Sequence, residues 1–102
     1  MAEVIATEIL VKYPIEKRNF SMDFSSLMSS TETISSITSV TSEKIGGESS
    51  DLTITDEFID GQTVTCWIEG GTKAISYRVK FVIVTSLGQI LEGDGTLKVT
   101  NR

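Results

Sequence analysis

The segment AISYRVKFVIVTS, residues 74–86, restricts the fold of this chain more than any other. Its apolar residues recur at every second position, which is the period of a β-strand that buries one face. We expect the following side chains to line a core: Ile75, Tyr77, Val79, Phe81 and Ile83. The opposite face begins polar but becomes apolar at Val82 and Val84, so one end of this strand needs a second cover.

Two sources could supply that cover. The N-terminal arm carries Val4, Ile5 and Ile9 and could fold back over the strand. A neighbouring subunit is the alternative, because exposed apolar patches on soluble proteins usually mark interfaces. The sequence leaves both sources open, and the candidate interface comprises Val4, Ile5, Ile9, Val82 and Val84.

The rest of the chain also favours strands. FSMDF alternates, with Phe20, Met22 and Phe24 on one face. In residues 31–43, TETISSITSVTSE, the apolar residues are three apart, but the many Ser and Thr side chains compete for the backbone and disfavour a helix. This segment therefore predicts an irregular or bulged strand. About seven strands separated by turn signals predict an immunoglobulin-like antiparallel β-sandwich.

Pro14 marks the expected domain boundary. Residues 1–13 form an N-terminal arm, and residues 14–102 form the β-sandwich domain. The arm is compatible with either a helix or a strand.

Composition argues against several function classes. The net charge is −5, and the nine Lys and Arg residues are scattered along the chain, so the chain lacks the basic face that nucleic-acid binding needs. The N-terminus carries acids where a signal peptide would carry cations, and its apolar residues are too interrupted for a membrane span. We therefore expect a protein that folds in a cytoplasm and contacts neither nucleic acid nor membrane.

No catalytic, metal-binding or cofactor-binding residue is predicted. The chain has no histidine, and its single cysteine, Cys66, is expected to be a buried apolar thiol. Gly70-Gly71 lacks the context of a phosphate loop and reads as a turn. Glu92 and Asp94 in EGDG do not have calcium-loop spacing, so a bulge with two glycines is expected there.

Two aromatic residues are expected to have packing roles. A Trp in a central strand of a sandwich usually lies in the core, so Trp67 is predicted to be buried. Stacking on a sugar is the alternative, and it would require an exposed ring. The Tyr77 hydroxyl is expected near backbone groups, in loose analogy to the tyrosine corner of sandwich domains.

The order of segments resembles small structural proteins of tailed bacteriophages, in particular the fiber–tail adaptors. Four runs carry the resemblance, in this order: KYPIEKRNFSMDFSSL, ETISS, TVTCWIEGGTKAISYRV and VTSLGQ. The resemblance covers roughly residues 12 to 99. The chain departs from the family's pattern where Lys73-Ala74-Ile75 follows Gly-Gly-Thr, since a further Gly is commoner there, and where the N-terminal arm is longer than expected.

The resemblance implies a non-enzymatic virion protein that joins fibers or tail parts to the neck or tail. Its partners would be other virion proteins, and it would form a homo-oligomer in a symmetric ring. Two alternatives remain at this stage. One is a capsid decoration protein, which would use a similar sandwich. The other is an immunoglobulin-like module that binds the host surface and would need exposed aromatic or polar loops.

Overall fold

The computed structural model describes residues 2–5 and 10–100. These residues form eight strands and one 3-10 helix. The elements, in chain order, are β1 (Ala2–Ile5), β2 (Leu10–Lys12), β3 (Arg18–Asp23), η1 (Ser25–Leu27), β4 (Ile34–Lys44), β5 (Leu52–Asp60), β6 (Thr63–Gly70), β7 (Ser76–Thr85) and β8 (Ile90–Val99). The all-β prediction is therefore confirmed. The sequence was compatible with either a helix or a strand in the arm, and the structure has two strands there, β1 and β2.

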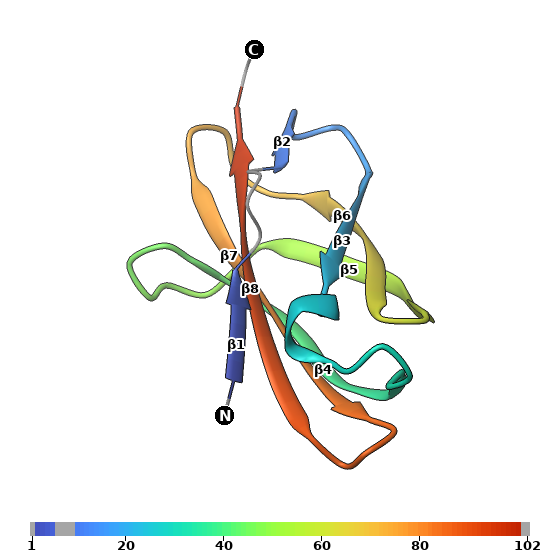
Figure 1. The fold of residues 1–102 in the computed structure, drawn as a ribbon. Coiled ribbons are helices and arrows are strands. Elements are labelled where there is room, and N and C mark those ends of the chain that lie inside the picture. Colours follow the sequence, from blue (N-terminus) through green and yellow to red (C-terminus); the bar gives the residue numbers. More distant parts are fainter. Residues whose placement is uncertain (1, 6–9, 101–102) are drawn as a thin grey trace.

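The strands form two sheets (Figure 1). Sheet A has the order β1-β8-β7-β4, and β2 also pairs with β8; sheet B has the order β3-β6-β5. Two hairpins, β5–β6 and β7–β8, lie each within one sheet, whereas the β3–β4, β4–β5 and β6–β7 connections cross between the sheets. Two sheets joined in this way agree with the predicted β-sandwich. Its immunoglobulin-like character stays a prediction.

Two bulges in β4 explain the three-residue spacing of its apolar residues. The register shifts between Ile34 and Ser36 and again between Ile37 and Ser39. As a result Ile34, Ile37 and Val40 pair with three alternate residues of β7, which are Thr85, Ile83 and Phe81. Paired residues point to the same side of a sheet, so each bulge returns the next apolar side chain to the core. The prediction of a bulged strand is confirmed.

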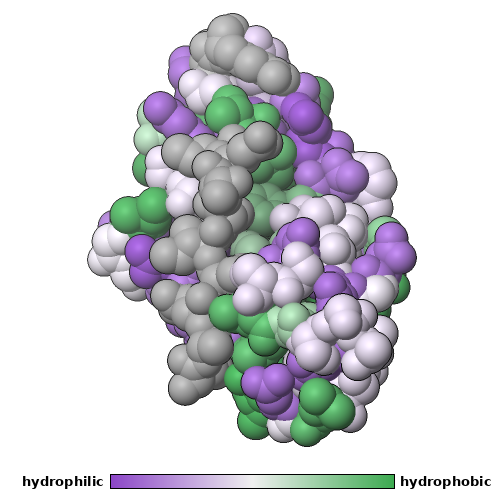
Figure 2. All heavy atoms as spheres, viewed as in Figure 1, coloured by the Kyte–Doolittle hydropathy of each residue, from purple (hydrophilic) through white to green (hydrophobic). Residues whose placement is uncertain are grey.

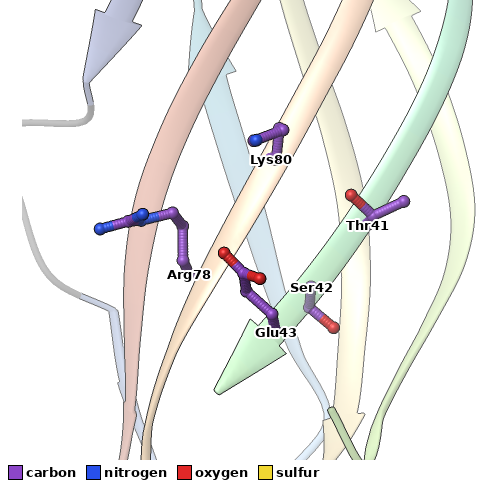
Figure 3. Close-up of a pocket in the computed structure, with 5 residues that line it drawn as sticks. All are labelled: Thr41, Ser42, Glu43, Arg78 and Lys80. Atoms are coloured by element: carbon purple, nitrogen blue, oxygen red, sulfur yellow. The ribbon is translucent and has the colours of Figure 1, made fainter. Parts of the chain in front are cut away.

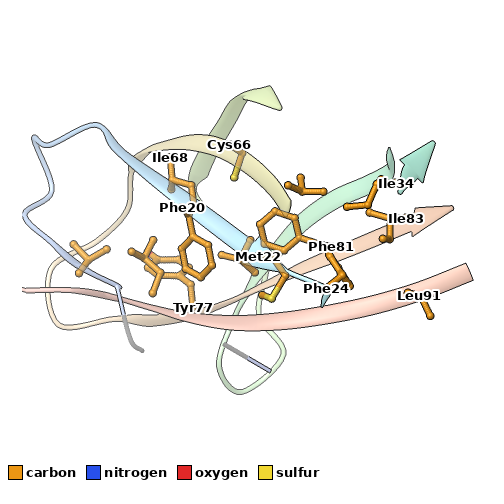
Figure 4. Packing of buried hydrophobic residues seen from close by; sticks show 14 residues of the cluster. Phe20, Met22, Phe24, Ile34, Cys66, Ile68, Tyr77, Phe81, Ile83 and Leu91 are labelled. Carbon is orange, nitrogen blue, oxygen red and sulfur yellow. The ribbon is translucent and has the colours of Figure 1, made fainter. Parts of the chain in front are cut away.

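The core lies between the inner faces of the two sheets. Phe20 and Met22 from β3 and Phe24, which follows β3, lie across from β7 and β8, and the Phe20 and Phe81 ring centroids are 5.9 Å apart (Figure 4). Tyr77, Val79, Phe81 and Ile83 are fully buried, as the alternation of β7 predicts, and Ile75 packs against them. Apolar burial of this kind is the main favourable contribution to the folding free energy.

Gly93 and Gly95 allow the aromatic side chains of β3 to approach β8. A Cβ at Gly95 would lie within 2.8 Å of two Phe20 ring carbons, and one at Gly93 would meet Met22 and Phe24 at about 2.9 Å. The register between β7 and β8 is continuous through both positions. The predicted bulge at EGDG is therefore wrong, because these glycines make room for a facing ring and do not kink the strand.

Two buried polar side chains form hydrogen bonds with the segments that connect β2 to β3 and β3 to β4. The Lys12 side chain is fully buried, and its Nζ donates a hydrogen bond to the backbone oxygen of Tyr13 at 2.8 Å. Burial lowers the pKa of Lys12, while the nearby Glu16 and Glu69 carboxylates oppose that effect. Glu32 is also buried and accepts hydrogen bonds from Gln89 Nε2, which ties the loop before β4 to the β7–β8 turn.

Candidate assembly interfaces

The N-terminal arm lies along the outer edge of β8. β1 and β2 both pair with β8 in parallel, at Leu91–Asp94 and at Leu97–Val99 (Figure 1). Val4 pairs with Gly93 and Ile5 with Asp94, whereas Ile9 lies outside the described residues. The arm thus extends sheet A at its edge. The structure therefore places Val4 and Ile5, two of the three candidate interface residues in the arm, beside β8.

Val82 and Val84 lie on the outer face of sheet A. Both are half-buried, and Val84 pairs with Ile90, which is exposed. Leu87 in the β7–β8 turn is 69% exposed and lies close to them in the chain. We call Val82, Val84, Leu87 and Ile90 the hairpin patch. Figure 2 shows apolar side chains gathered at the end of the molecule where this hairpin turns.

Trp67 lies outside the core, so its predicted burial is wrong. Its side chain is 37% exposed, because Val64, Cys66 and Ile68 of the same strand take the inward positions. A strand side chain between two buried neighbours must point to the other face. The alternation of residues 64–68 is visible in the sequence and is the signal that identifies Trp67 as outward-facing.

Phe58 shares the outer face of sheet B with Trp67. Phe58 pairs with Thr65 and is 50% exposed, while Trp67 pairs with Asn19 on one side and Thr55 on the other. A bulge at Asp56-Glu57, where Asp56 has φ 55, brings Phe58 to this face. Sequence alternation alone does not predict that position, because the bulge changes the phase of the strand.

A shallow depression lies on the outer face of sheet A (Figure 3). Its volume is about 100 Å³, and Thr41, Ser42, Glu43, Arg78 and Lys80 line it. Glu43 pairs with Arg78, and Thr41 pairs with Lys80, so strand register alone places these polar groups together. The depression is open and polar, unlike the enclosed and mostly apolar pockets that bind small molecules.

The Gly-Gly-Thr run forms the crossing from sheet B to sheet A. Gly70 and Gly71 have φ of +85 and +95, and a Cβ at Gly71 would lie 2.8 Å from Val99 Cγ2. Thr72 then donates two hydrogen bonds, from its N–H to the Tyr77 hydroxyl at 2.8 Å and from its Oγ1 to Asp51 Oδ2 at 2.6 Å. Each residue of the Gly-Gly-Thr run therefore has a structural role.

The hydrogen bonds of this crossing shift two pKa values in opposite directions. The Thr72 and Tyr77 hydroxyls donate to the Asp51 carboxylate and lower its pKa. Burial, with the hydrogen bond to Asp51, raises the pKa of the Tyr77 hydroxyl. The Tyr77 hydroxyl also accepts the Thr72 backbone N–H, so the expected contact with backbone is present.

Cys66 is fully buried, as predicted, and burial raises the pKa of its thiol to about 12. Within residues 2–5 and 10–100, no three His, Cys, Asp or Glu side chains come together as metal ligands could. Over the same part of the chain, no helix has the length and apolar character needed to cross a membrane.

Comparison with known proteins gives one family. The family model described as "Podophage GP4 fiber-tail adaptor protein gp77" matches residues 12–98. The matched range begins at Lys12 and ends within β8, so it includes both sheets and excludes β1. A search of curated proteins gave no match. The resemblance inferred from the sequence motifs is confirmed.

Proposed function

The chain belongs to the podophage GP4 fiber-tail adaptor family (gp77), and from that premise we propose that it joins tail fibers to the tail of the virion. In this role it acts without catalysis and buries surface against neighbouring virion proteins. The observation that carries the proposal is the family match over residues 12–98, which includes strands of both sheets. A capsid decoration role lacks such support.

The interfaces that we propose are the N-terminal arm and the hairpin patch. Residues 1–11 lie outside the range that the family model matches. β1 pairs with the edge of β8, and strand addition at a sheet edge is a common way for proteins to assemble. Val4, Ile5 and Ile9 together with Val82 and Val84 would then contact a neighbouring subunit.

We further propose that the protein forms a symmetric ring in the virion after folding in the host cytoplasm. A tail has cyclic symmetry, and an adaptor bound around it contacts equivalent neighbours. Quantitative mass spectrometry of purified particles tests this arrangement. A ring predicts about six or twelve copies per particle. Copies in the hundreds would indicate capsid decoration, and absence from the particle would contradict every virion role.

Deletion of the arm tests its role in assembly. The deletion should remove residues 2–9 and retain β2, because Leu10 packs against the core and Lys12 is fully buried. We expect the shortened protein to fold, with a native circular dichroism spectrum, but to fail to bind particles that lack the adaptor. Normal incorporation of the shortened protein would exclude the arm as an interface.

Val82→Asp tests the hairpin patch, with Thr96→Asp as the matched control. Val82 and Thr96 are both half-buried residues of sheet A whose register places them on its outer face. A carboxylate at an apolar contact is desolvated without a partner, so Val82→Asp should prevent incorporation. Thr96→Asp adds the same charge outside the patch and should be incorporated. If the two variants are incorporated to the same extent, the hairpin patch is not part of the interface.

A further inference from the structure

The outer face of sheet B carries aromatic side chains between acidic ones. Strand register arranges this face in rows across β3, β6 and β5. Glu69 lies in the first row, Trp67 in the second and Phe58 in the third. In the fourth row Asp23 and Asp60 flank Thr63. The two exposed rings therefore lie between carboxylates at both ends of the face.

The three strands of sheet B, all of which the structure describes, carry no Lys or Arg on this outer face; the cation near Glu69 is Lys12, which lies in β2. β5 and β6 contain neither Lys nor Arg, and the single cation of β3 is Arg18. Arg18 pairs with the buried Ile68 and forms an ion pair with Glu16 at 3.8 Å, so it does not belong to the outer face. The face is thus both acidic and aromatic, and these two properties together favour a cationic partner.

Thr55, next to Trp67, adds an unsatisfied polar group. Thr55 pairs with Trp67, and its Oγ1 is buried without a hydrogen-bond partner among the described residues. A buried hydroxyl without a partner is unfavourable, so a rotation of Thr55 that brings this oxygen to a donor of a docked protein would be favoured.

A second copy of this chain does not match the face. The outward-facing charged residues of β4, β7 and β8 balance, with three cations and three carboxylates: Arg78, Lys80, Lys98, Glu43, Glu92 and Asp94. Contact between two sheet B faces would bring like charges together, which is unfavourable. We therefore place the cations on a different protein.

We infer that the outer face of sheet B docks a partner protein through Arg and Lys side chains of that partner, with Trp67 and Phe58 at the centre of the contact. A guanidinium stacks well on an exposed indole and also pairs with carboxylates. This inference rests on the proposed adaptor function only in taking the partner to be a virion protein. The chemistry of the face comes from the strands themselves.

Binding of a fluorescein-labelled nona-arginine peptide to the full-length protein tests the inference. Fluorescence anisotropy gives the Kd, and nona-glutamate serves as the reversed-charge control. Trp67→Thr should weaken nona-arginine binding by about tenfold or more, since aromatic residues at the centre of an interface carry most of the affinity. Added salt should weaken it as well.

Two charge variants separate a specific face from overall acidity. Asp60→Asn with Glu69→Gln removes two charges from the face, and we expect binding about tenfold weaker. Glu43→Gln with Glu92→Gln removes the same net charge from the outer face of sheet A, and its Kd should change by less than about twofold. Circular dichroism of each variant establishes that it is folded. Equal weakening by the two pairs would overturn the inference, and so would absence of nona-arginine binding.

Two further results would indicate that the face binds something other than a cationic protein. Dimers in sedimentation velocity that disappear in Trp67→Thr would assign the face to a second copy. A shift of Trp67 emission with dextran but not with nona-arginine would assign it to a neutral sugar. Incorporation into particles is measured separately. A protein that binds the peptide as expected but is not incorporated contradicts the adaptor role and leaves the docking face intact.

Discussion

The Tyr77 hydroxyl donates a hydrogen bond to the Asp51 carboxylate, 26 residues earlier in the chain. Tyr77 belongs to β7 of sheet A, whereas Asp51 immediately precedes β5 of sheet B. Thr72 completes the contact by donating to both groups. The two sheets are therefore joined by polar contacts at this end in addition to apolar packing, and the joint is made by the Gly-Gly-Thr run and Tyr77.

Tyr77→Phe tests how much this joint stabilises the sandwich. The variant keeps the buried ring but leaves the Asp51 and Thr72 groups without the hydroxyl. We expect a loss of about 1.5–3 kcal/mol in the free energy of unfolding, the range for hydrogen bonds in which one partner is charged. Urea denaturation followed by circular dichroism measures the loss. An unchanged unfolding midpoint would show that water replaces the hydroxyl without penalty.

Ala74→Gly should stabilise the protein. Ala74 has φ 69, in the left-handed region that disfavours any side chain, and it lies in the turn between Thr72 and β7. Removing the Cβ relieves about 1–2 kcal/mol of strain in the folded state, but glycine also gives the unfolded chain more conformational entropy, which offsets part of that stabilisation. We expect a net gain of a few tenths to about 1 kcal/mol, measured as a higher Tm.

The control for Ala74→Gly is Ser76→Gly. Ser76 is the first residue of β7, and its φ is not positive, so glycine at this position relieves no strain. The control should lower the Tm, because glycine in a strand loses more conformational freedom on folding. A lower Tm for both variants would mean that Ala74 is not strained.

Gly95→Ala should destabilise the protein through a clash with Phe20. The added Cβ would lie 2.8 Å from the Phe20 Cε1 atom and nearer still to its Cζ, so the ring or β8 must shift. Overpacking of this kind costs about 1–3 kcal/mol. Combining Gly95→Ala with Phe20→Leu should cost less than the sum of the two single changes, which a double-mutant cycle measures. Strict additivity would show that the ring does not cause the loss.

The alternation of apolar residues predicted most of the core, since β3 and β7 bury the side chains that the period of two selects. It did not predict which face Trp67 occupies, because the usual role of a sandwich Trp outweighed the alternation of Val64, Cys66 and Ile68. Phe58 depends on a bulge, and bulges change the strand phase without a clear sequence signal. The glycines of β8 depend on side chains of β3, about 70 residues away, which no local pattern records.

The buried Cys66 thiol makes stability depend on pH above neutrality. Its pKa is about 12 in the folded protein, against 9.0 for a thiol exposed to water, so the unfolded chain releases the thiol proton at lower pH. Stability from this residue is complete below pH 9 and is lost as the pH rises from 9 toward 12. At pH 10.5 the loss is on the order of 2 kcal/mol.

Cys66→Ala should remove this loss. The variant leaves a small cavity and is less stable than the wild type at pH 7.5, but the cavity penalty does not change with pH. We therefore expect the stability difference between the two proteins to narrow or reverse at pH 10.5, as measured by urea denaturation at both pH values. Tyr77 also titrates in this range, but it is present in both proteins and its effect cancels in the comparison. A constant difference between the two proteins would show that the Cys66 thiol ionises equally in the folded and unfolded states.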